Sequence, residues 1–492
     1  MLFNSAEYLL VLLPMAFAVY FLLGKSGQAA AAKLWLILVS LFFYGWWNPD
    51  YLALLGLSIL VNFWIGTRLI AHGADNQSTG SRLLLAGVIF NLGLLAWFKY
   101  AGFVVANANL LLGLHLPAPN IVLPLAVSFF TFTQLAYLVD CRRKLASEYS
   151  FSNYVLFVTF FPHLIAGPIL HHREMMPQFE SRKNLFPHPV NLALGLSLIS
   201  MGLFKKVVIA DTFSGWATAG FDQPNSLSFF GAWITSLSYT FQLYFDFSGY
   251  TDIALGSALL FNIRLPVNFN SPYKARNIQD FWRRWHITLS RFLRDYLYVP
   301  LGGNRRGRAR VLANLIVTFI LGGLWHGASW MFVIWGGLHG AAMIIHRTWV
   351  QLGIALPQWL AWLITFNFVN LAWVFFRARD MADAMRVLKG MAGFNGLVLP
   401  AAIGDWLPRL KSMGVSFGPV MGAGNDGVQA ILWLLAAFAI VLGFRNSNQL
   451  APFAGDVRTI SPGWAAFCGL MTSVSVVGIL ASKYSEFIYF NF

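Results

Sequence analysis

Two histidines, whose side chains can transfer protons, lie within an apolar stretch of this sequence. Residues 321–340 read LGGLWHGASWMFVIWGGLHG, so His326 and His339 lie among Leu, Trp, Phe and Ile side chains. An ionisable ring in such surroundings is costly unless it faces a protein interior or a wet cavity. Imidazole exchanges protons near neutral pH, which makes His326 a candidate general base; the alternative for His326 is a structural hydrogen bond to a neighbouring helix. A single helix would place the two rings on roughly opposite faces, and for His339 we favour a structural hydrogen bond to a neighbouring helix.

A third histidine, His286, lies in a basic run, QDFWRRWHITLSRFLRDYLYVPLGGNRRGR, at residues 279–308. If residues 282–296 form a helix, six apolar side chains fall within one arc of about 100° and the arginines fall on the other side. This pattern predicts a helix that lies at the membrane interface or dips through it. His286 falls at the edge of the apolar arc, and the pattern alone fits an anchor helix with an incidental histidine as well as a chemical role.

Further polar residues interrupt other apolar segments. Asp246 and Asp252 lie in YTFQLYFDFSGYTDIALG, and Asp140 ends LPLAVSFFTFTQLAYLVD. His163 lies between two prolines in VTFFPHLIAGPIL, where we expect a broken helix that turns back. Acids are expensive in lipid, so we expect the aspartates to face the protein interior. Structural hydrogen bonds explain most of these residues, yet together they describe a polar interior that suits a channel, a transporter or an enzyme.

The elements that must position these residues follow from composition. Of the 492 residues, 58% are apolar and 11% are charged, with a mean hydropathy of +0.62, whereas a soluble domain carries about 25% charged residues. Apolar stretches near the length that crosses a bilayer recur along the whole chain. Their cores lie near residues 8–24, 34–47, 51–70, 83–98, 121–139, 151–170, 190–210, 228–262, 311–346, 358–376, 428–443 and 462–481. The sequence therefore predicts an all-α polytopic membrane protein with about ten to twelve membrane segments, some of them re-entrant.

The net charge of +15 is concentrated in one region. Residues 274–310 contain ten Lys or Arg and only two acidic residues, Asp280 and Asp295. Short basic loops face the cytoplasm, so we expect this region on that side. Its setting in an apolar chain argues against nucleic-acid binding and favours a membrane surface or an anionic cytoplasmic substrate. The two cysteines, Cys141 and Cys468, form neither a zinc-binding spacing nor a disulfide framework, and no metal site is expected.

Several longer motifs carry a resemblance to a known family. FFPHLIAGPIL, QLYFDFSGYTDIALG, FWRRWHITLSRFLRDYLYVPLGGNRRG, LGGLWHGASW and WVFFRARD occur in this order, after FYGWWNPDYLAL near the N-terminus. Together they resemble the membrane-bound O-acyltransferase (MBOAT) family, in particular the bacterial branch with the alginate O-acetylation membrane subunit and the teichoic-acid D-alanylation membrane protein. The resemblance implies one domain over residues 1–492, with a basic segment at 279–310 and an aromatic C-terminal motif at 484–492. It implies a ring of tilted transmembrane and re-entrant helices around a central funnel, in the bacterial inner membrane.

The resemblance also implies roles for individual residues. His326 matches the WHG histidine of the family, the expected catalytic residue, and His286 matches a second family histidine at the base of a funnel open to the cytoplasm. An acyl thioester, with acetyl-CoA as the expected donor, reacts there without a metal or a tightly bound cofactor. Arginines of the basic segment suit the phosphates of coenzyme A, although anchoring at the membrane surface explains them equally well. These arginines are Arg283, Arg284, Arg291 and Arg305.

The C-terminal sequence YSEFIYFNF resembles a motif of the same bacterial systems, in which a tyrosine carries the acyl group. That tyrosine is Tyr489 here, and the alternative is an aromatic belt at headgroup depth. The expected partners are a periplasmic esterase-like acetyltransferase, a polysaccharide acceptor and the lipid bilayer. We favour acetylation of an alginate-type polymer, with cellulose, peptidoglycan or teichoic acid as alternative acceptors. From a different class, a multi-span transporter or a non-catalytic scaffold of an exopolysaccharide complex is the alternative.

Overall fold

The chain is helical almost throughout. A computed structural model describes residues 1–72, 77–148, 150–165, 167–401, 404, 408–412, 414–421, 427–451, 461–481 and 487–488. Within these residues two short strands, β1 (Val398–Leu399) and β2 (Ser416–Phe417), pair in parallel, with Val398 opposite Ser416. The all-α fold predicted from the sequence is confirmed.

Apolar helices make up the N-terminal part of the chain. α4, η2 and α5 form one stretch, Gln77–Leu112, which is interrupted by the π-helical turn η2. Such π-turns inside α-helices occur frequently at functional sites. The elements are η1 (Glu7–Leu12), α1 (Leu13–Lys25), α2 (Ala29–Gly45), α3 (Tyr51–His72), α4 (Gln77–Leu95), η2 (Ala96–Tyr100), α5 (Ala101–Leu112) and α6 (Val127–Arg142).

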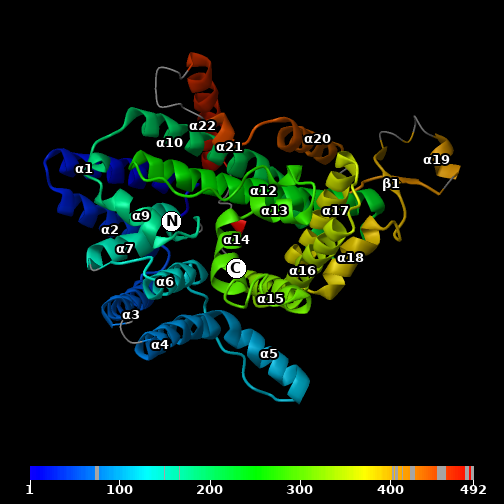
Figure 1. Cartoon of the computed structure of the whole chain (residues 1–492). Coiled ribbons are helices and arrows are strands. Elements are labelled where there is room, and N and C mark those ends of the chain that lie inside the picture. The colour runs from blue at the N-terminus through cyan, green and yellow to red at the C-terminus, as the bar shows by residue number, and fades with distance from the viewer. Residues whose placement is uncertain are drawn as a thin grey trace.

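The long helix α12 crosses the centre of the molecule (Figure 1). Its 32 residues span about 48 Å at 1.5 Å per residue, more than the roughly 30 Å of a hydrocarbon core, so it must tilt or extend beyond the bilayer core. α12 packs along α10 and α11, and glycines of α10 and α12 let the two backbones approach closely. The elements of this part are α7 (Phe151–Thr159), α8 (Phe161–Leu164), α9 (His172–Glu180), η3 (Arg182–Leu185), α10 (Pro189–Leu203), η4 (Phe204–Ala210), α11 (Asp211–Phe221) and α12 (Phe229–Leu260).

The C-terminal part combines short helices with a tight helical hairpin. α15 and α16 form the hairpin, while α20 packs on α12 and α22 packs on α10, as Figure 1 shows. The elements are η5 (Pro272–Lys274), α13 (Ile278–Arg284), α14 (Ile287–Leu293), η6 (Arg294–Tyr298), α15 (Arg308–His326), α16 (Trp330–Gln351), α17 (Gln358–Arg377), α18 (Met381–Met391), α19 (Pro408–Ser412), α20 (Val428–Gly443), α21 (Ser447–Leu450) and α22 (Pro462–Ala481).

Seven helical stretches of the described residues are long and apolar enough to cross a membrane by length and composition. α2 and α20 are apolar but shorter. The protein is therefore a multi-pass membrane protein, as predicted. We expected about ten to twelve membrane segments, and that number included stretches that the structure divides into shorter helices. The prediction of a broken helix at His163 is confirmed, because α7 ends at Thr159 and the four-residue helix α8 follows. The seven stretches are Glu7–Lys25, Tyr51–Ala71, Gln77–Leu112, Pro189–Phe221, Arg308–His326, Gln358–Arg377 and Pro462–Ala481.

The predicted continuous helix over residues 282–296 is wrong. α13 ends at Arg284, and His286 adopts a left-handed backbone conformation with φ 43° and ψ 55° before α14 begins. The chain turns here because the side chains of Trp285 and His286 are both buried in the core, which a straight helix at the surface would not allow. A non-glycine residue in this conformation is strained, and such strain clusters at functional sites.

Candidate active site

His326 is the last residue of α15 and lies at the turn of the α15–α16 hairpin. Gly327 follows in an extended conformation, and Ser329 caps α16 by accepting a hydrogen bond from the main-chain N–H of Met331 at 3.1 Å. A β-carbon on Gly327 would collide with the ring of Phe332, so glycine is required at this turn. The turn also corrects the expectation of opposite faces on a single helix, because His326 and His339 belong to different helices.

Aromatic side chains surround the imidazole of His326, which is 3% exposed. Its ring centroid lies 4.9 Å from that of Trp325, 5.2 Å from Trp335 and 5.1 Å from Phe376. This packing encloses the ring of His326 in protein and not in lipid, as an ionisable ring in an apolar segment requires. Aromatic walls exclude water, and a base in such a site acts on a substrate without competition from bulk solvent.

His286 also neighbours Trp325 and is fully buried. Its ring centroid is 6.2 Å from that of Trp325 and 4.8 Å from that of Phe247 on α12. Neither ring nitrogen of His286 has a hydrogen-bond partner among the described residues. Buried polar atoms are nearly always satisfied in a resting protein, so two orphaned nitrogens indicate a place where a ligand supplies the partner.

His339 has the structural role that we expected. The indole Nε1 of Trp282 on α13 donates a hydrogen bond to Nδ1 of His339 at 3.2 Å. The ring also packs on Trp335 at 4.8 Å. His339 therefore joins α13 to α16 and supports the ring of Trp335, which contacts His326.

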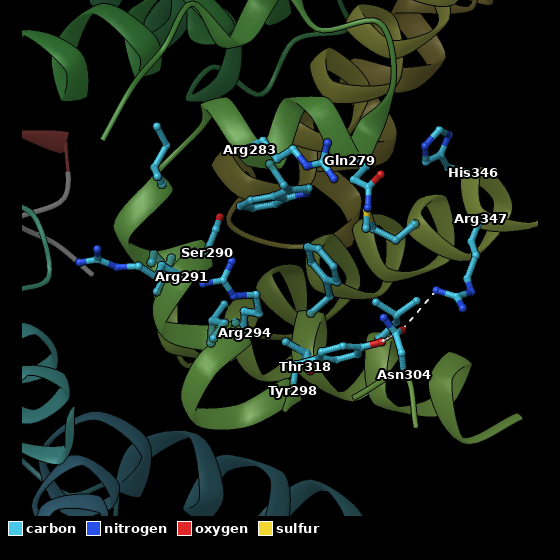
Figure 2. Close-up of a pocket in the computed structure, with 18 of the residues that line it drawn as sticks. Gln279, Arg283, Ser290, Arg291, Arg294, Tyr298, Asn304, Thr318, His346 and Arg347 are labelled. Atoms are coloured by element: carbon cyan, nitrogen blue, oxygen red, sulfur yellow. Dashed lines mark hydrogen bonds between the residues drawn. The ribbon is translucent and has the colours of Figure 1, made fainter. Parts of the chain in front are cut away.

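A cavity of about 730 Å³ lies next to Trp335, and Figure 2 shows the polar side chains around this cavity. Two of the four predicted arginines, Arg283 and Arg291, line the cavity. Trp335 and Leu289 also line it, and the ring of Trp335 contacts that of His326. The volume falls within the range of about 300–1,000 Å³ that is usual for ligand pockets.

The other predicted arginines lie outside the lining. Arg284 pairs with Asp280 at 2.8 Å, and Arg305 does not contribute to the cavity wall. Sequence reasoning missed two cationic lining residues, Arg294 and Arg347. Arg294 belonged to the polar side of the predicted interfacial helix, which was a usable signal, whereas Arg347 comes from α16 and no local pattern connects it to this cavity.

Ion pairs already engage part of the positive charge of the cavity. Arg291 forms a two-pronged pair with Glu174, at 2.7 and 3.0 Å, and Arg294 pairs with Asp295 at 2.7 Å. Burial raises the pKa of the Tyr298 phenol, against the opposing effect of Arg347, so Tyr298 stays a neutral donor to Asn304. Among the described residues Arg283 forms no ion pair, which leaves its guanidinium available to an anionic ligand.

The aspartates of α12 face the protein interior, as predicted. Asp246 pairs with Lys206 at 2.7 Å, and Asp252 pairs with Lys205 at 2.6 Å. Both lysines belong to the π-helical turn η4, which the sequence did not reveal. Asp140 likewise accepts a hydrogen bond from Tyr296 at 2.9 Å.

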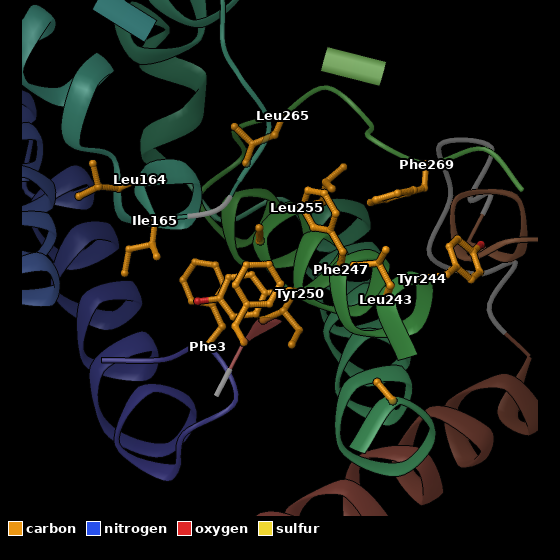
Figure 3. Close-up of a cluster of buried hydrophobic side chains, with 14 of the residues drawn as sticks. Phe3, Leu164, Ile165, Leu243, Tyr244, Phe247, Tyr250, Leu255, Leu265 and Phe269 are labelled. Atoms are coloured by element: carbon orange, nitrogen blue, oxygen red, sulfur yellow. The ribbon is translucent and has the colours of Figure 1, made fainter. Parts of the chain in front are cut away.

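Tyr489 lies outside the described residues, but the two residues before it are placed. The ring of Phe487 is fully buried and stacks on Tyr250 at 4.0 Å. The main-chain N–H of Ile488 donates to Oδ2 of Asp246 at 3.0 Å. Figure 3 shows the apolar surroundings, with Tyr250 and Phe247 among them. The ring of Phe487 contacts that of Phe247, and Phe247 in turn contacts His286. The residues that precede Tyr489 are therefore connected to the candidate site through Phe247.

A pair of buried histidines and an arginine-lined cavity in a polytopic helical protein form a candidate site, but this geometry alone does not identify a reaction. The comparisons supply the reaction class. The family model for the membrane-bound O-acyltransferase family matches residues 125–379, a range that contains both His286 and His326. The chain belongs to this family and is an O-acyltransferase.

Relatives over the full length agree with this assignment. The peptidoglycan O-acetyltransferase of Helicobacter pylori is 46% identical, over 100% of this chain and 98% of that protein. The probable alginate O-acetylase AlgI of Pseudomonas aeruginosa is 40% identical, over 100% of both chains. The teichoic acid D-alanyltransferase of Bacillus subtilis is 28% identical, over 54% of this chain and 71% of that protein.

Proposed function

We propose that this protein takes an acetyl group from acetyl-CoA on the cytoplasmic side of the bacterial inner membrane and passes it on for O-acetylation of an extracytoplasmic polysaccharide. The observation that carries the proposal is the position of Trp335, which contacts the ring of His326 and also lines the arginine-bearing cavity. An anionic donor bound in the cavity has its reactive end directed toward the histidines.

The arginines supply the donor site. Coenzyme A carries a pyrophosphate and a ribose phosphate, and guanidinium groups bind phosphate through paired, charge-assisted hydrogen bonds. Among the described residues, Arg283 and Arg347 line the cavity without an ion pair, while Arg291 is held in place by Glu174. No cofactor stays bound between turnovers, because the thioester is a substrate that leaves as the free thiol.

The two histidines divide the chemistry. His326 accepts the proton of the acceptor hydroxyl as its oxygen attacks the thioester carbonyl carbon. The carbon–sulfur bond then breaks, the proton passes to the departing sulfur, and an ester and a thiol result. His286, whose ring nitrogens await a partner, orients the donor or donates to the carbonyl oxygen as negative charge develops there. General acid–base help of this kind contributes about 10²–10⁴-fold to the rate.

Two acceptors are the leading candidates. The relative at 46% identity is named a peptidoglycan O-acetyltransferase, and this favours peptidoglycan. The relatives named probable alginate O-acetylases that match the full chain are 34% to 40% identical, and the motifs of the basic segment favour that group. In either case a periplasmic esterase-like acetyltransferase completes the delivery to the polymer.

The test is the acetate content of each polymer in cells that carry the chain or its variants. We expect base-released acetate from one glycan fraction to disappear with His326→Ala while the protein remains in the membrane at normal abundance. His115→Ala is the matched control, because His115 is exposed and lies outside residues 125–379, which match the family model. Normal acetylation in the His326 variant would favour a scaffold or transporter instead, and the fraction that loses acetate identifies the acceptor.

A further inference from the structure

A lysine that the proposed mechanism does not use lies beside the helix end that carries His326. Lys99 belongs to η2, the π-turn between α4 and α5. Its ammonium donates a hydrogen bond to the main-chain carbonyl of Trp325 and another to Oγ of Ser128, the latter at 3.2 Å. It also lies 5.8 Å from the ring centroid of Trp325. The residue that it holds is the immediate neighbour of His326.

The next residue of the same turn strengthens the contact. The hydroxyl of Tyr100 donates to the main-chain carbonyl of Leu324 at 2.7 Å. The last carbonyls of a helix lack partners inside the helix and carry partial negative charge. Lys99 and Tyr100 therefore hold two successive carbonyls at the end of α15, and the π-turn gives both side chains the required direction.

Charge distinguishes Lys99, which is half-buried, from the two lysines of η4. Lys205 and Lys206 each pair with an aspartate, whereas no Asp or Glu of the described residues pairs with Lys99. A neutral donor such as Tyr100 suffices to cap a helix. An unpaired ammonium inside a candidate membrane span is costly and marks a functional site by default.

We propose that Lys99 is a positioning residue for acyl transfer, which fixes the end of α15 and places an uncompensated positive charge beside His326. The inference rests on the proposed role of His326. The ammonium of Lys99 binds the main-chain carbonyl of Trp325, so its charge lies at the residue next to His326. A positive charge here stabilises the negative charge that develops on the thioester oxygen during attack.

Three substitutions separate the charge from the hydrogen bond. Lys99→Met removes both, Lys99→Gln keeps a hydrogen-bond donor without the charge, and Lys99→Arg keeps both. The neighbouring Tyr100→Phe removes one carbonyl contact and no charge. The full-length protein in detergent is given acetyl-CoA together with peptidoglycan fragments or alginate oligosaccharide, whose hydroxyl groups accept the acetyl group. Release of the thiol is followed, and kcat and KM are determined for each variant.

We expect kcat to fall about 10²-fold in both the Met and the Gln variants, with an unchanged KM for acetyl-CoA and with kcat largely restored in the Arg variant. Tyr100→Phe should lower kcat less than about tenfold. Near-normal kcat in Lys99→Gln would overturn the proposal, because the lysine would then be only a helix cap. A normal thermal unfolding midpoint of the Gln variant keeps its result interpretable if the Met variant fails to fold.

His326→Ala in the same assay separates the two proposals. If His326→Ala stays active, the proposed function fails. If His326→Ala is inactive while Lys99→Gln has a normal kcat, only the present inference fails.

Discussion

The indole of Trp335 contacts the imidazole of His326, with their ring centroids 5.2 Å apart, and the same side chain lines the arginine-bearing cavity. One side chain thus connects the proposed donor site with the proposed base. Its position depends on the hairpin of α15 and α16, because Trp335 belongs to α16 and His326 ends α15. Close packing of these two helices is therefore a condition for activity.

Gly336→Ala should disable the enzyme through this packing. A β-carbon at Gly336 would collide with the main-chain carbonyl of Phe319 on α15, so the helices must separate at a cost of about 1–3 kcal/mol, and His326 moves relative to the cavity. The measurement is thiol release together with the unfolding midpoint. Gly337→Ala is the control, since a β-carbon there meets no atom within 4 Å. Equal activity of the two variants would contradict the packing argument.

Arg283→Gln should weaken donor binding. The loss of one charge-assisted contact with phosphate, about 1.5–3 kcal/mol, raises the KM for acetyl-CoA at least tenfold. kcat at saturation should stay unchanged, because the contact is the same in the ground state and the transition state. Steady-state kinetics against acetyl-CoA concentration measure both quantities.

Arg284→Gln is the matched control for that experiment. Arg284 is the adjacent residue but pairs with Asp280 and does not line the cavity. We expect its KM to remain near normal. An equal rise in KM for both variants would indicate a general effect of surface charge and not a phosphate site.

His286→Ala should cause a large but incomplete loss of activity. The orphaned nitrogens of His286 await a ligand, yet water entering the vacated space replaces part of an orienting hydrogen bond. We therefore expect a smaller loss of kcat than for His326→Ala, measured at equal protein concentration. If only protein abundance falls while activity per molecule is normal, His286 is an anchor and has no chemical role.

Some features of the fold and of the candidate site could be predicted from the sequence, and others could not. Apolar stretches predicted the helices, and a WHG motif singled out His326, because both signals are local. The left-handed conformation of His286 is set by burial of Trp285 and was invisible in the 282–296 pattern. Lys99 was missed altogether, since its significance lies in a contact with Trp325, 226 positions along the chain. Contacts of that kind are decided by packing and not by periodicity.

The loop from Asn304 to Arg310 should face the cytoplasm because it is densely basic. A cysteine introduced by Arg308→Cys, after both native cysteines are replaced by serine, should resist a membrane-impermeant maleimide added to intact spheroplasts. The same cysteine should react once the membrane is permeabilised, which controls for accessibility. Ready labelling of intact spheroplasts would place the arginine-lined cavity on the wrong side for a cytoplasmic thioester.

Tyr489→Phe should stop delivery of acetyl groups to the polymer. The preceding chain is anchored at α12, where the N–H of Ile488 donates to Asp246 at 3.0 Å and Phe487 stacks on Tyr250. Phenylalanine keeps the ring and its interfacial preference, so only one hydroxyl is lost. A belt residue would lose a hydrogen bond worth about 0.5–1.5 kcal/mol, and acetylation would continue.

An acyl carrier would instead lose its only nucleophile. The readout is acetate on the polymer in cells, and Tyr484→Phe, which removes the other C-terminal tyrosine hydroxyl, serves as the control. We expect polymer acetylation to vanish in the Tyr489 variant and to persist in the Tyr484 variant. Full acetylation with Tyr489→Phe would rule out the relay, and His326 would then activate the hydroxyl of the polymer or of a partner directly.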